Sequence, residues 1–322
     1  MAQIIKYNSP MTAKTSFTKE ELIRLLADYN LGQYQDHKPF EQGADQTNIL
    51  VVTTKGKYAF RYYEKRSVNY VLFEIDLLQY LAKHSYPCPA PLKNGQGGYM
   101  GMYNHKPFAF FAFLEGEHNN NDEDNFKEAA RVIGKLHTIT RDYKPSHAEA
   151  RDKYDPASCL AYATAHTHKI KTATDTQLRL DWLKGELCKL QLPDALPKGA
   201  CHGDCNPTNF LYLHGPVSAV LDFDQSSYTY LLYDVASLIY WWTWPDKGEI
   251  DFSQSRSLLE AYESVRTLEQ REKEHLYDML KMINFMGYAW FIHDDEDYLN
   301  SQRKVELLNS IGREAFYKTL FE

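Results

Sequence analysis

The sequence predicts an α+β protein with a small β-rich lobe at residues 1–115 and a larger helical lobe at residues 116–322. Before residue 115, short stretches rich in β-branched and aromatic residues outnumber helical patterns. After Gly116, apolar residues mostly recur at helical spacing, and only residues 199–225 read as strands. This order of segments is typical of an α+β architecture, and 322 residues suit one large domain or two ordinary ones.

The N-terminal lobe is expected to be mostly sheet with one long helix. Residues 16–30 read as a short helix that Ser16 or Thr18 can cap, and residues 48–63 read as two strands around a turn at Lys55-Gly56. Residues 68–84 form the long helix. The segment CPAPL must be extended, and two further β-like stretches follow it and end in FAFFAFLEG.

The C-terminal lobe is expected to be helical around one β-rich stretch. A loop at residues 119–122 precedes a helix at residues 124–140. Residues 155–190 and 255–322 also have helical patterns, and no internal repeat or low-complexity linker separates them.

Composition places the chain among ordinary globular proteins. Hydrophobic residues make up 43%, charged residues 25% and aromatic residues 14%, which suffices for a sizeable core. The formal net charge of −7 argues against nonspecific nucleic-acid binding. No run of about 18 apolar residues exists, and the first residues lack the apolar stretch of a secretory signal. We therefore expect neither a nucleic-acid nor a membrane partner.

The five cysteines are odd in number and widely spaced, which does not suggest a disulfide framework. A reducing cytoplasm is therefore the expected location. Cys201 and Cys205 lie close to His202 and invite a zinc interpretation, but no second ligand pair follows at a suitable spacing. Zinc is thus a minor alternative.

Charge is divided unevenly along the chain. Residues 1–114 hold 13 Lys and Arg against 9 Asp and Glu, a net charge of +4, whereas residues 115–322 hold 23 against 34, a net charge of −11. Ordinary surface variation is one explanation. The other is that the N-terminal part binds an anion and the C-terminal part binds a cation.

The β-rich stretch carries the chemistry. Residues 202–209 read HGDCNPTN and precede a hairpin with strands expected at 210–213 and 217–221. Asn209 enters this hairpin and Asp222 leaves it, so neighbouring strands bring the two side chains toward one point. An amide oxygen and a carboxylate are hard ligands that suit Mg²⁺ bridging phosphates. Asp204, just ahead, is placed to accept a proton from an attacking hydroxyl.

The same three residues match a spacing known from phosphoryl transfer. The kinase catalytic loop H-R-D-x-x-x-x-N separates its base from a metal-binding Asn by five positions, and a second Asp follows. Asp204 and Asn209 are also five positions apart. Each Asp or Asn taken alone is more typical of a turn. The combination favours a kinase whose catalytic residues are Asp204, Asn209 and Asp222.

The motifs HGDCNPTN, AVLDFDQ and YDVA resemble those of the superfamily of aminoglycoside phosphotransferases, choline kinases and type II homoserine kinases. The common pattern there is HGD-x-x-P-x-N, then IDF or IDW, then a D-L-A-like motif. The resemblance runs nearly end to end, and segments such as FAFLEG and LLEAYESVRTLEQRE are most similar to the bacterial homoserine kinase branch. It implies a bilobal protein-kinase-like fold that binds ATP and Mg²⁺ in its cleft.

The resemblance implies roles for individual positions. Asp204 matches the catalytic base, Asn209 one Mg²⁺ ligand and Asp222 the second. Asp234, in LYDVA, matches the acid that braces the catalytic loop, and we assign His202 to the same structural brace. The alternative for Asp234 is a simple helix N-cap, which is compatible with the brace.

The N-terminal lobe is expected to bind the nucleotide. Arg61 shares a strand face with Ala59 and matches the family's phosphate-binding Lys or Arg. Glu74, on the following helix, is its expected ion-pair partner, and a solvated helix charge is the alternative.

Two further segments are candidates for nucleotide contacts. The loop at residues 41–48 has a single Gly and is a weak candidate for covering the phosphates. The run at residues 110–114 matches the hinge beside the adenine edge, although its residues alone indicate only a buried strand. The hinge residues assigned to cofactor binding are Phe111 and Phe113.

The acceptor is harder to predict. Homoserine carries an ammonium and a carboxylate, so its site needs an acid and a planar donor such as Arg. The segments LYDVASLIYWWTWPD and MINFMGYAWFIHDDEDY contain aromatic and acidic residues but no Arg, unlike the corresponding homoserine kinase helix. Aromatic rings with carboxylates suit an amine or a quaternary ammonium. The other interpretation is that the Trp residues are core and the acids end a helix. The candidate acceptor residues are Asp224, Tyr240, Trp244, Trp290 and Asp294, with Trp241, Trp242, Asp295 and Glu296 beside them.

The sequence therefore predicts an ATP- and Mg²⁺-dependent kinase that phosphorylates a hydroxyl group of a small, amine-bearing molecule. Homoserine kinase-like activity is the first expectation, and an aminoglycoside, choline or ethanolamine acceptor is the alternative. A pseudokinase scaffold would lack a base or metal residue, but none is missing from residues 202–209. A protein kinase is disfavoured because no A-P-E signature follows DFD.

Overall fold

The computed structural model describes residues 14–40, 45–118, 124–246 and 248–322. They confirm the α+β class and form two compact units. Unit 1 comprises Met1–Asp122, Lys144–Arg151 and Phe210–Asp224, and unit 2 comprises Glu123–Tyr143, Asp152–Asn209 and Gln225–Glu322. The first 115 residues all belong to unit 1, but two later segments of the chain join them. The compact units are therefore not contiguous in sequence, and the division of roles between two lobes stays a prediction.

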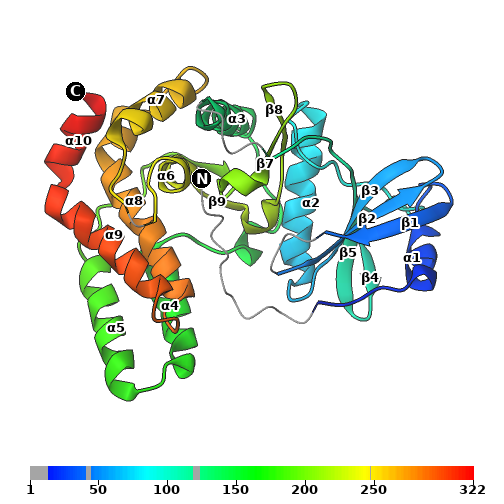
Figure 1. The fold of residues 1–322 in the computed structure, drawn as a ribbon, viewed down its shortest axis with the longest axis horizontal. Helices are drawn as coiled ribbons and strands as arrows, with labels where there is room; N and C mark the ends of the chain where they lie inside the picture. The colour runs from blue at the N-terminus through cyan, green and yellow to red at the C-terminus, as the bar shows by residue number, and fades with distance from the viewer. Residues whose placement is uncertain (1–13, 41–44, 119–123, 247) are drawn as a thin grey trace. The chain divides into compact units, whose positions relative to one another are not determined.

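Unit 1 is built on a five-stranded antiparallel sheet (Figure 1). Its strand order is β1-β2-β3-β5-β4. The strands are β1 (Tyr34–Pro39), β2 (Thr47–Thr53), β3 (Gly56–Tyr62), β4 (Gly101–Tyr103) and β5 (Lys106–Ala112). The predicted turn at Lys55-Gly56 joins β2 to β3, where Thr53 pairs with Gly56.

Helix α1 (Lys19–Leu26) covers one face of this sheet. Its Leu22 and Leu26 belong to the same buried cluster as Phe60 of β3 and Phe110 of β5. The helix begins after Thr18, because the Thr18 side chain accepts from the backbone N–H of the third helical residue and completes a capping box. Of the two predicted caps, Thr18 is therefore the one used.

The opposite face of the sheet carries the predicted nucleotide residues. The register pairs Leu50 with Ala59 and Ala59 with Phe111, so these three side chains share this face. Arg61, two residues beyond Ala59, points the same way. Leu50, Ala59 and Arg61 are half-buried, in contrast to the fully buried face against α1.

Helix α2 (Val68–Lys83) begins after Ser67, whose side chain caps it. The predicted extended segment CPAPL runs beside β5, since the Leu92 N–H donates to the Phe110 carbonyl and the Ala112 N–H donates to the Ala90 carbonyl. The short helix η1 (Ala148–Ala150) also belongs to unit 1.

The predicted hairpin is present in unit 1 as β7 (Phe210–Tyr212) and β8 (Val217–Val220). Its turn uses the left-handed region at His214 and Gly215. The Val220 N–H donates to the Pro87 carbonyl at 2.7 Å, and Tyr212 forms a bridge with Glu117. These contacts explain why the hairpin joins the N-terminal segment.

Unit 2 is helical and contains one short two-stranded sheet, in which β6 (Lys198–Cys201) pairs with β9 (Ser227–Tyr230). Its helices are α3 (Asn125–Ile139), α4 (Pro156–His166), α5 (Ala173–Leu187), α6 (Leu232–Trp242), α7 (Phe252–Glu263), α8 (Gln270–Trp290), α9 (Asp297–Ile311) and α10 (Arg313–Phe321). Helix α8 is central, because it contacts α4, α6, α9 and α10 and is buried along most of its length.

Short 3₁₀ helices complete the description: η2 (Thr167–Lys169) and η3 (Pro207–Asn209) in unit 2, and η4 (Phe223–Gln225) at the boundary between the segments of units 1 and 2. All five cysteines are free thiols. Among the described helices, none combines the length and the apolar character that crossing a bilayer requires.

Candidate active site

The loop at residues 202–209 follows β6 in unit 2 and ends with η3. Gly203 has φ +86°, and a Cβ atom there would lie 2.3 Å from the carbonyl oxygen of Gln225. Only glycine therefore fits this position. The Gly203 N–H donates to Asp234 Oδ1 at 2.9 Å, so the backbone of the loop turns toward α6.

Asp234, in the first turn of α6, binds this loop. Its Oδ2 accepts a hydrogen bond from the His202 N–H at 2.7 Å and lies 3.1 Å from His137 Nε2. Burial acts to raise the pKa of Asp234, but His137 and the donated hydrogen bonds outweigh it and lower that pKa. The carboxylate is thus charged and buried, with its partners in place. The geometry agrees with the predicted brace, whose functional role stays a prediction.

His137 is a site residue that sequence reasoning missed. It lies on α3, and its Nδ1 is 2.7 Å from Tyr262 Oη while its Nε2 faces Asp234. On sequence alone, His137 was one of several residues along a helix face. No local pattern could indicate a contact with a residue 97 positions away.

Two more side chains of α6 contact the loop. Ser237 Oγ accepts from the Cys205 N–H at 3.0 Å, and Trp242 Nε1 donates to the Cys205 carbonyl at 2.9 Å. Cys205 is therefore bonded to α6 through both its backbone N–H and its backbone carbonyl. With Asp234, these contacts fix the backbone on either side of Asp204.

Asp204 and Asn209 lie within hydrogen-bond distance of each other. Asn209 Nδ2 donates to the Asp204 carbonyl at 2.9 Å and to Asp204 Oδ2 at 3.1 Å. The Asp204 N–H in turn donates to Nδ1 of the buried His202 at 3.2 Å. The η3 turn, which begins at Pro207, brings Asn209 into contact with Asp204, five positions earlier in the chain.

Asp222 follows β8 in unit 1. It has φ +58°, in the left-handed region that few residues other than Gly adopt. Its side chain is 43% exposed, and Oδ1 accepts from Arg61 Nη2 at 3.0 Å. A residue in a sparsely populated conformation needs its surroundings to hold it there.

Arg61 forms the predicted ion pair with Glu74, at 3.1 Å. Its Nε also donates to Asn48 Oδ1 at 3.0 Å, so three acceptors surround one guanidinium. Burial acts to lower the pKa of Arg61, but Asp222 and Glu74 raise it above its usual value. Burial also raises the pKa of Glu74, which accepts a further bond from the Tyr63 hydroxyl at 3.1 Å.

The predicted convergence of Asn209 and Asp222 stays a prediction. Asn209 ends the segment Asp152–Asn209 of unit 2, and Asp222 lies in the segment Phe210–Asp224 of unit 1. The hairpin that the sequence placed between them is present.

Asp224, a predicted acceptor residue, is paired within unit 1. Arg66 Nη2 donates to its Oδ2 at 2.6 Å, and Gln46 Nε2 lies 3.4 Å from the same oxygen. Burial acts to raise the pKa of Asp224, but Arg66 lowers it. Asp224 is thus a buried carboxylate with a guanidinium partner, and its role in acceptor binding stays a prediction.

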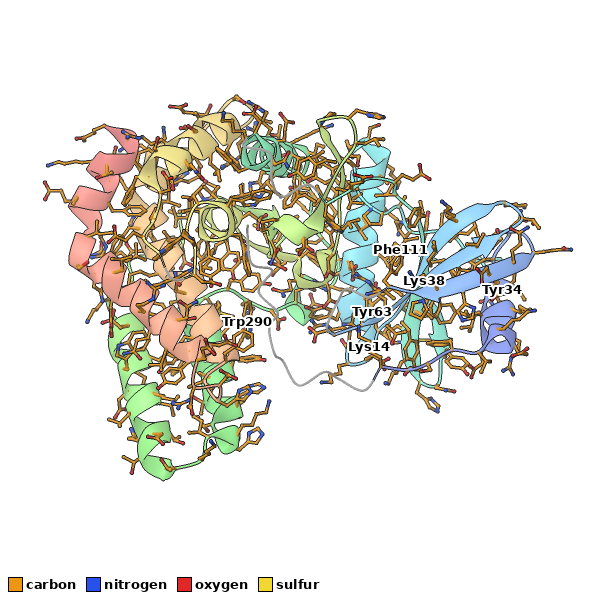
Figure 2. All side chains as sticks on the ribbon, viewed as in Figure 1. Lys14, Tyr34, Lys38, Tyr63, Phe111 and Trp290 are labelled. Carbon is orange, nitrogen blue, oxygen red and sulfur yellow. The ribbon has the colours of Figure 1, made fainter. Side chains whose placement is uncertain are left out.

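The predicted hinge residues lie at the end of β5. Phe111, which is labelled in Figure 2, is buried, and Phe113 is half-buried. The Phe113 ring is parallel to the ring of Phe40, with centroids 6.5 Å apart. Of the predicted phosphate-covering loop at residues 41–48, positions 41–44 lie outside the described residues.

Two of the predicted acceptor aromatics contact a lysine of the protein itself. Lys304 Nζ lies 4.0 Å from the centroid of the Tyr240 ring and 5.0 Å from that of Trp244. It also donates to the Trp244 carbonyl at 3.4 Å and lies 3.8 Å from Asp246 Oδ1. The two rings thus already face a cation, which matches the interpretation of these aromatics as core. Trp241, beside them, packs edge-on against Tyr240.

The remaining predicted acceptor residues lie at the end of α8 and the start of α9. Trp290 is the half-buried last residue of α8 (Figure 2). Asp294 Oδ1 accepts hydrogen bonds from the backbone N–H groups of Glu296, the N-cap residue of α9, and of Asp297, its first residue.

A pocket of about 360 Å³ opens beside Asp294 in unit 2. Its lining combines both signs of charge, and Arg179 of α5 pairs there with Asp295. Sequence reasoning missed this arginine because it lies 116 positions before its partner. The lining residues are Ile170, Lys171, Asp175, Arg179, His293, Asp294, Asp295 and Glu296.

The zinc alternative gains no support from the buried cysteines. His137, Cys201 and Asp234 offer ligand atoms within 4.8 Å of one another. However, these side chains already have hydrogen-bond partners, since the Cys201 thiol donates to the Tyr230 carbonyl at 3.3 Å and His137 Nε2 lies 3.1 Å from Asp234 Oδ2. We therefore interpret this cluster as part of the hydrogen-bonded core that supports the loop at 202–209.

Known proteins are similar in sequence to this chain. Residues 36–270 match the model of the phosphotransferase enzyme family. A homoserine kinase from Sinorhizobium medicae is 30% identical over 271 residues, which cover 83% of this chain and 81% of the relative. A homoserine kinase from Nitrobacter winogradskyi is 29% identical over 319 residues, which cover 94% of this chain and 96% of the relative.

Solved structures share the fold. An amicoumacin kinase in complex with AMP-PNP, Ca²⁺ and Ami has a TM-score of 0.70 at 18% identity, over 92% of this chain and 93% of that chain. A microcompartment-associated aminopropanol kinase has a TM-score of 0.67 at 15% identity, over 89% and 93%. The structural likeness confirms the predicted kinase-like fold, and the sequence matches identify a small-molecule kinase. The chain belongs to the phosphotransferase enzyme family.

Proposed function

We propose that this protein transfers the γ-phosphoryl group of ATP to a hydroxyl group of homoserine or a closely similar hydroxy amino acid. The observation that supports this most is the contact between Asp204 and Asn209, on a loop that Asp234 holds in place. Phosphoryl transfer asks a protein mainly for positioning and charge stabilisation. The five free thiols agree with action in the cytoplasm.

Asp204 is the proposed base. In the reaction, the acceptor oxygen forms a bond to the γ-phosphorus, and the hydroxyl proton passes to the Asp204 carboxylate. The bond between the γ-phosphorus and its bridging oxygen breaks, and ADP leaves. Asn209 orients the base, because its amide donates to Asp204 Oδ2.

Asn209 and Asp222 each offer a hard oxygen, and we propose that these residues bind Mg²⁺. Asn209 uses its amide nitrogen toward Asp204, so its oxygen Oδ1 is the atom left to act as a ligand. Asp222 Oδ2 accepts no hydrogen bond from the described residues of unit 1, and the side chain is partly exposed. Both are hard oxygen ligands. When bound, the cation neutralises charge on the phosphates.

Unit 1 is proposed to bind the nucleotide. Arg61 steadies the phosphates, and Glu74 fixes the direction of its guanidinium. Ala59 and Phe111 lie on the same sheet face as Arg61, and Phe111 and Phe113 are proposed to meet the adenine at the hinge. Asp224 forms an ion pair with Arg66, and we propose that it positions residues of unit 1 and does not bind the acceptor.

A zwitterionic acceptor fits the observations better than a purely cationic one. The pocket beside Asp294 combines carboxylates with Lys171, which suits an acceptor with an ammonium and a carboxylate, whereas Arg179 there already pairs with Asp295. The aromatic pair Tyr240 and Trp244, which suggested a quaternary ammonium, already faces Lys304. About 30% identity to homoserine kinases over most of the chain points the same way.

A coupled assay of ADP release tests this proposal. Purified protein with ATP and MgCl₂ is offered homoserine, choline, ethanolamine, an amino sugar or an aminoglycoside. We expect kcat/KM for homoserine to exceed the others at least about ten-fold. Asp294→Asn should raise the KM for the acceptor and leave the KM for ATP unchanged, whereas Glu260→Gln, an exposed control on α7, should change neither. Preference for choline, or no ADP release with any acceptor, would contradict the proposal.

A further inference from the structure

Arg151 is a buried arginine that the proposed reaction does not use directly. It ends Lys144–Arg151, a segment that belongs to unit 1 although the chain on both sides belongs to unit 2. Only 4% of the Arg151 surface is exposed to solvent. No motif or hydrophobic period marks this position in the sequence.

The Arg151 guanidinium joins two parts of unit 1. Its Nη1 donates to the Tyr70 carbonyl at 3.0 Å, in the first turn of α2. Its Nη2 donates to the carbonyls of Phe223, at 3.2 Å, and of Asp224. Because a guanidinium is planar and rigid, these bonds set the distance between α2 and residues 223–224.

Tyr70 reinforces this connection. The Arg151 guanidinium carbon lies 3.7 Å from the centroid of the Tyr70 ring and 5.0 Å from that of Phe73, close enough for favourable cation–π contact. The Tyr70 hydroxyl donates to the Asp224 carbonyl at 2.8 Å. One aromatic residue of α2 thus holds both the arginine and a carbonyl that the arginine binds.

The two parts that Arg151 connects carry residues that are predicted to take part in metal and phosphate binding. Tyr70 precedes Glu74 by four positions, so both lie on one side of α2. Asp222 directly precedes Phe223. Glu74 and Asp222 both pair with Arg61, so Arg61 links α2 to Asp222 through side chains. Arg151 makes the parallel link through the backbone.

We propose that Arg151 is a positioning residue that holds Asp222 at a set distance from α2 and thereby sets the affinity for the metal–nucleotide complex. This inference rests on the proposed function. Asp222 has φ +58°, a conformation that persists only when neighbouring contacts impose it. The bonds to Phe223 and Asp224 supply such contacts immediately after it.

The test compares Arg151→Met and Arg151→Lys with Asp222→Ala and with Arg24→Met, a control at an exposed arginine of α1 in the same unit. Thermal unfolding first identifies the variants that fold. ATP turnover is then measured against MgCl₂ concentration, and Mn²⁺ binding in the presence of AMP-PNP is followed by electron paramagnetic resonance.

We expect Arg151→Met to raise both the half-saturating Mg²⁺ concentration and the Kd for Mn²⁺ about ten-fold, with kcat at saturating metal within about three-fold of wild type. The metal affinity of Arg151→Lys should lie between those of the wild type and Arg151→Met, because an ammonium restores the charge but cannot span both partners. Tyr70→Phe keeps the ring and removes the bond to Asp224, so it should shift metal affinity in the same direction by a smaller factor. If neither Arg151 variant folds, the metal affinity of Tyr70→Phe tests the proposal in their place.

Wild-type metal dependence in the folded variants, beside lost metal binding in Asp222→Ala, would overturn this inference and leave the proposed function standing. A fall in kcat with unchanged metal affinity would overturn it as well. If the wild-type protein bound no metal with AMP-PNP, the proposed function and this inference would fall together.

Discussion

Asp204 is the side chain on which the proposed chemistry depends most. Its backbone is fixed on both sides, by bonds from His202 and Gly203 to Asp234 and from Cys205 to Ser237. Its carboxylate is oriented by Asn209. Such preorganisation is what a general base needs before the acceptor arrives.

Replacing Asp204 with Asn keeps the shape of the side chain and removes the proton acceptor. We expect kcat to fall about 10²- to 10⁴-fold, while the affinity for ATP stays within a few-fold, because the nucleotide is proposed to bind unit 1. Steady-state kinetics and a nucleotide titration measure the two effects. Asp181→Asn, at an exposed carboxylate of α5, is the control. Normal turnover in Asp204→Asn would remove Asp204 from the mechanism.

Lys304 contributes to stability in a pH-dependent way. Burial lowers the pKa of Lys304 from 10.5 to about 7. The unfolded chain therefore keeps the proton more readily than the folded one. The charged lysine destabilises the fold fully below pH 7, and this destabilisation fades as the pH rises from 7 toward 10.5.

Lys304→Met is accordingly expected to raise the Tm at pH 6, with a smaller gain at pH 9. Thermal unfolding at the two pH values measures the difference. Lys135→Met, at an exposed lysine of α3, should show no such pH-dependent gain. A gain that is larger at pH 9 than at pH 6 would show that the aromatic rings and Asp246 stabilise the ammonium more than burial disfavours it.

Helix α6 is the element that holds the loop at residues 202–209, which is proposed to be catalytic. Asp234, Ser237 and Trp242 all lie on it and all bond to residues 202–205. A rigid helix positions such groups more accurately than a loop does. Changes on α6 should therefore affect catalysis without a direct contact to substrate.

Ser237→Ala and Trp242→Phe each remove one bond from Cys205 to α6. Each is expected to lower the free energy of unfolding by about 1 kcal/mol and to reduce kcat more than it raises the KM for ATP. Chemical denaturation and steady-state kinetics provide the two measurements. Ser310→Ala, at an exposed serine of α9, is the control. An equal change in both kinetic constants would argue against loop positioning.

For the protein as a whole, nucleotide binding should depend on the metal. A ligand that binds only the folded state stabilises it by RT ln(1 + [L]/Kd), which is about 2.7 kcal/mol at a ligand concentration of 100 Kd. We expect ATP with MgCl₂ to raise the Tm by several degrees and ATP with a chelator to raise it clearly less. Asp222→Ala should lose the difference between the two. Equal shifts with and without the metal would indicate a scaffold.

Local patterns were sufficient for most of the fold. The capped helices, the turn at Lys55-Gly56 and the hairpin after Asn209 each depend on residues close together in the chain, and the structure confirms them. The membership of that hairpin in unit 1 depends instead on its contacts with Pro87 and Glu117. Such contacts between distant segments leave no periodic trace in either one.

The order of residues 202–234 was enough to indicate a kinase, because the residues proposed as base, metal ligand and brace follow one another at a known spacing. The backbone makes neighbours of Asp204 and Asn209 and of Asp234 and the loop before them. Packing was needed to reveal which side chains support them. His137 meets Asp234, Arg151 meets the turn after Asp222, and Lys304 meets the rings proposed for an acceptor. Each of these contacts joins elements far apart in the chain, so its existence depends on how helices and strands pack in three dimensions and not on any local spacing.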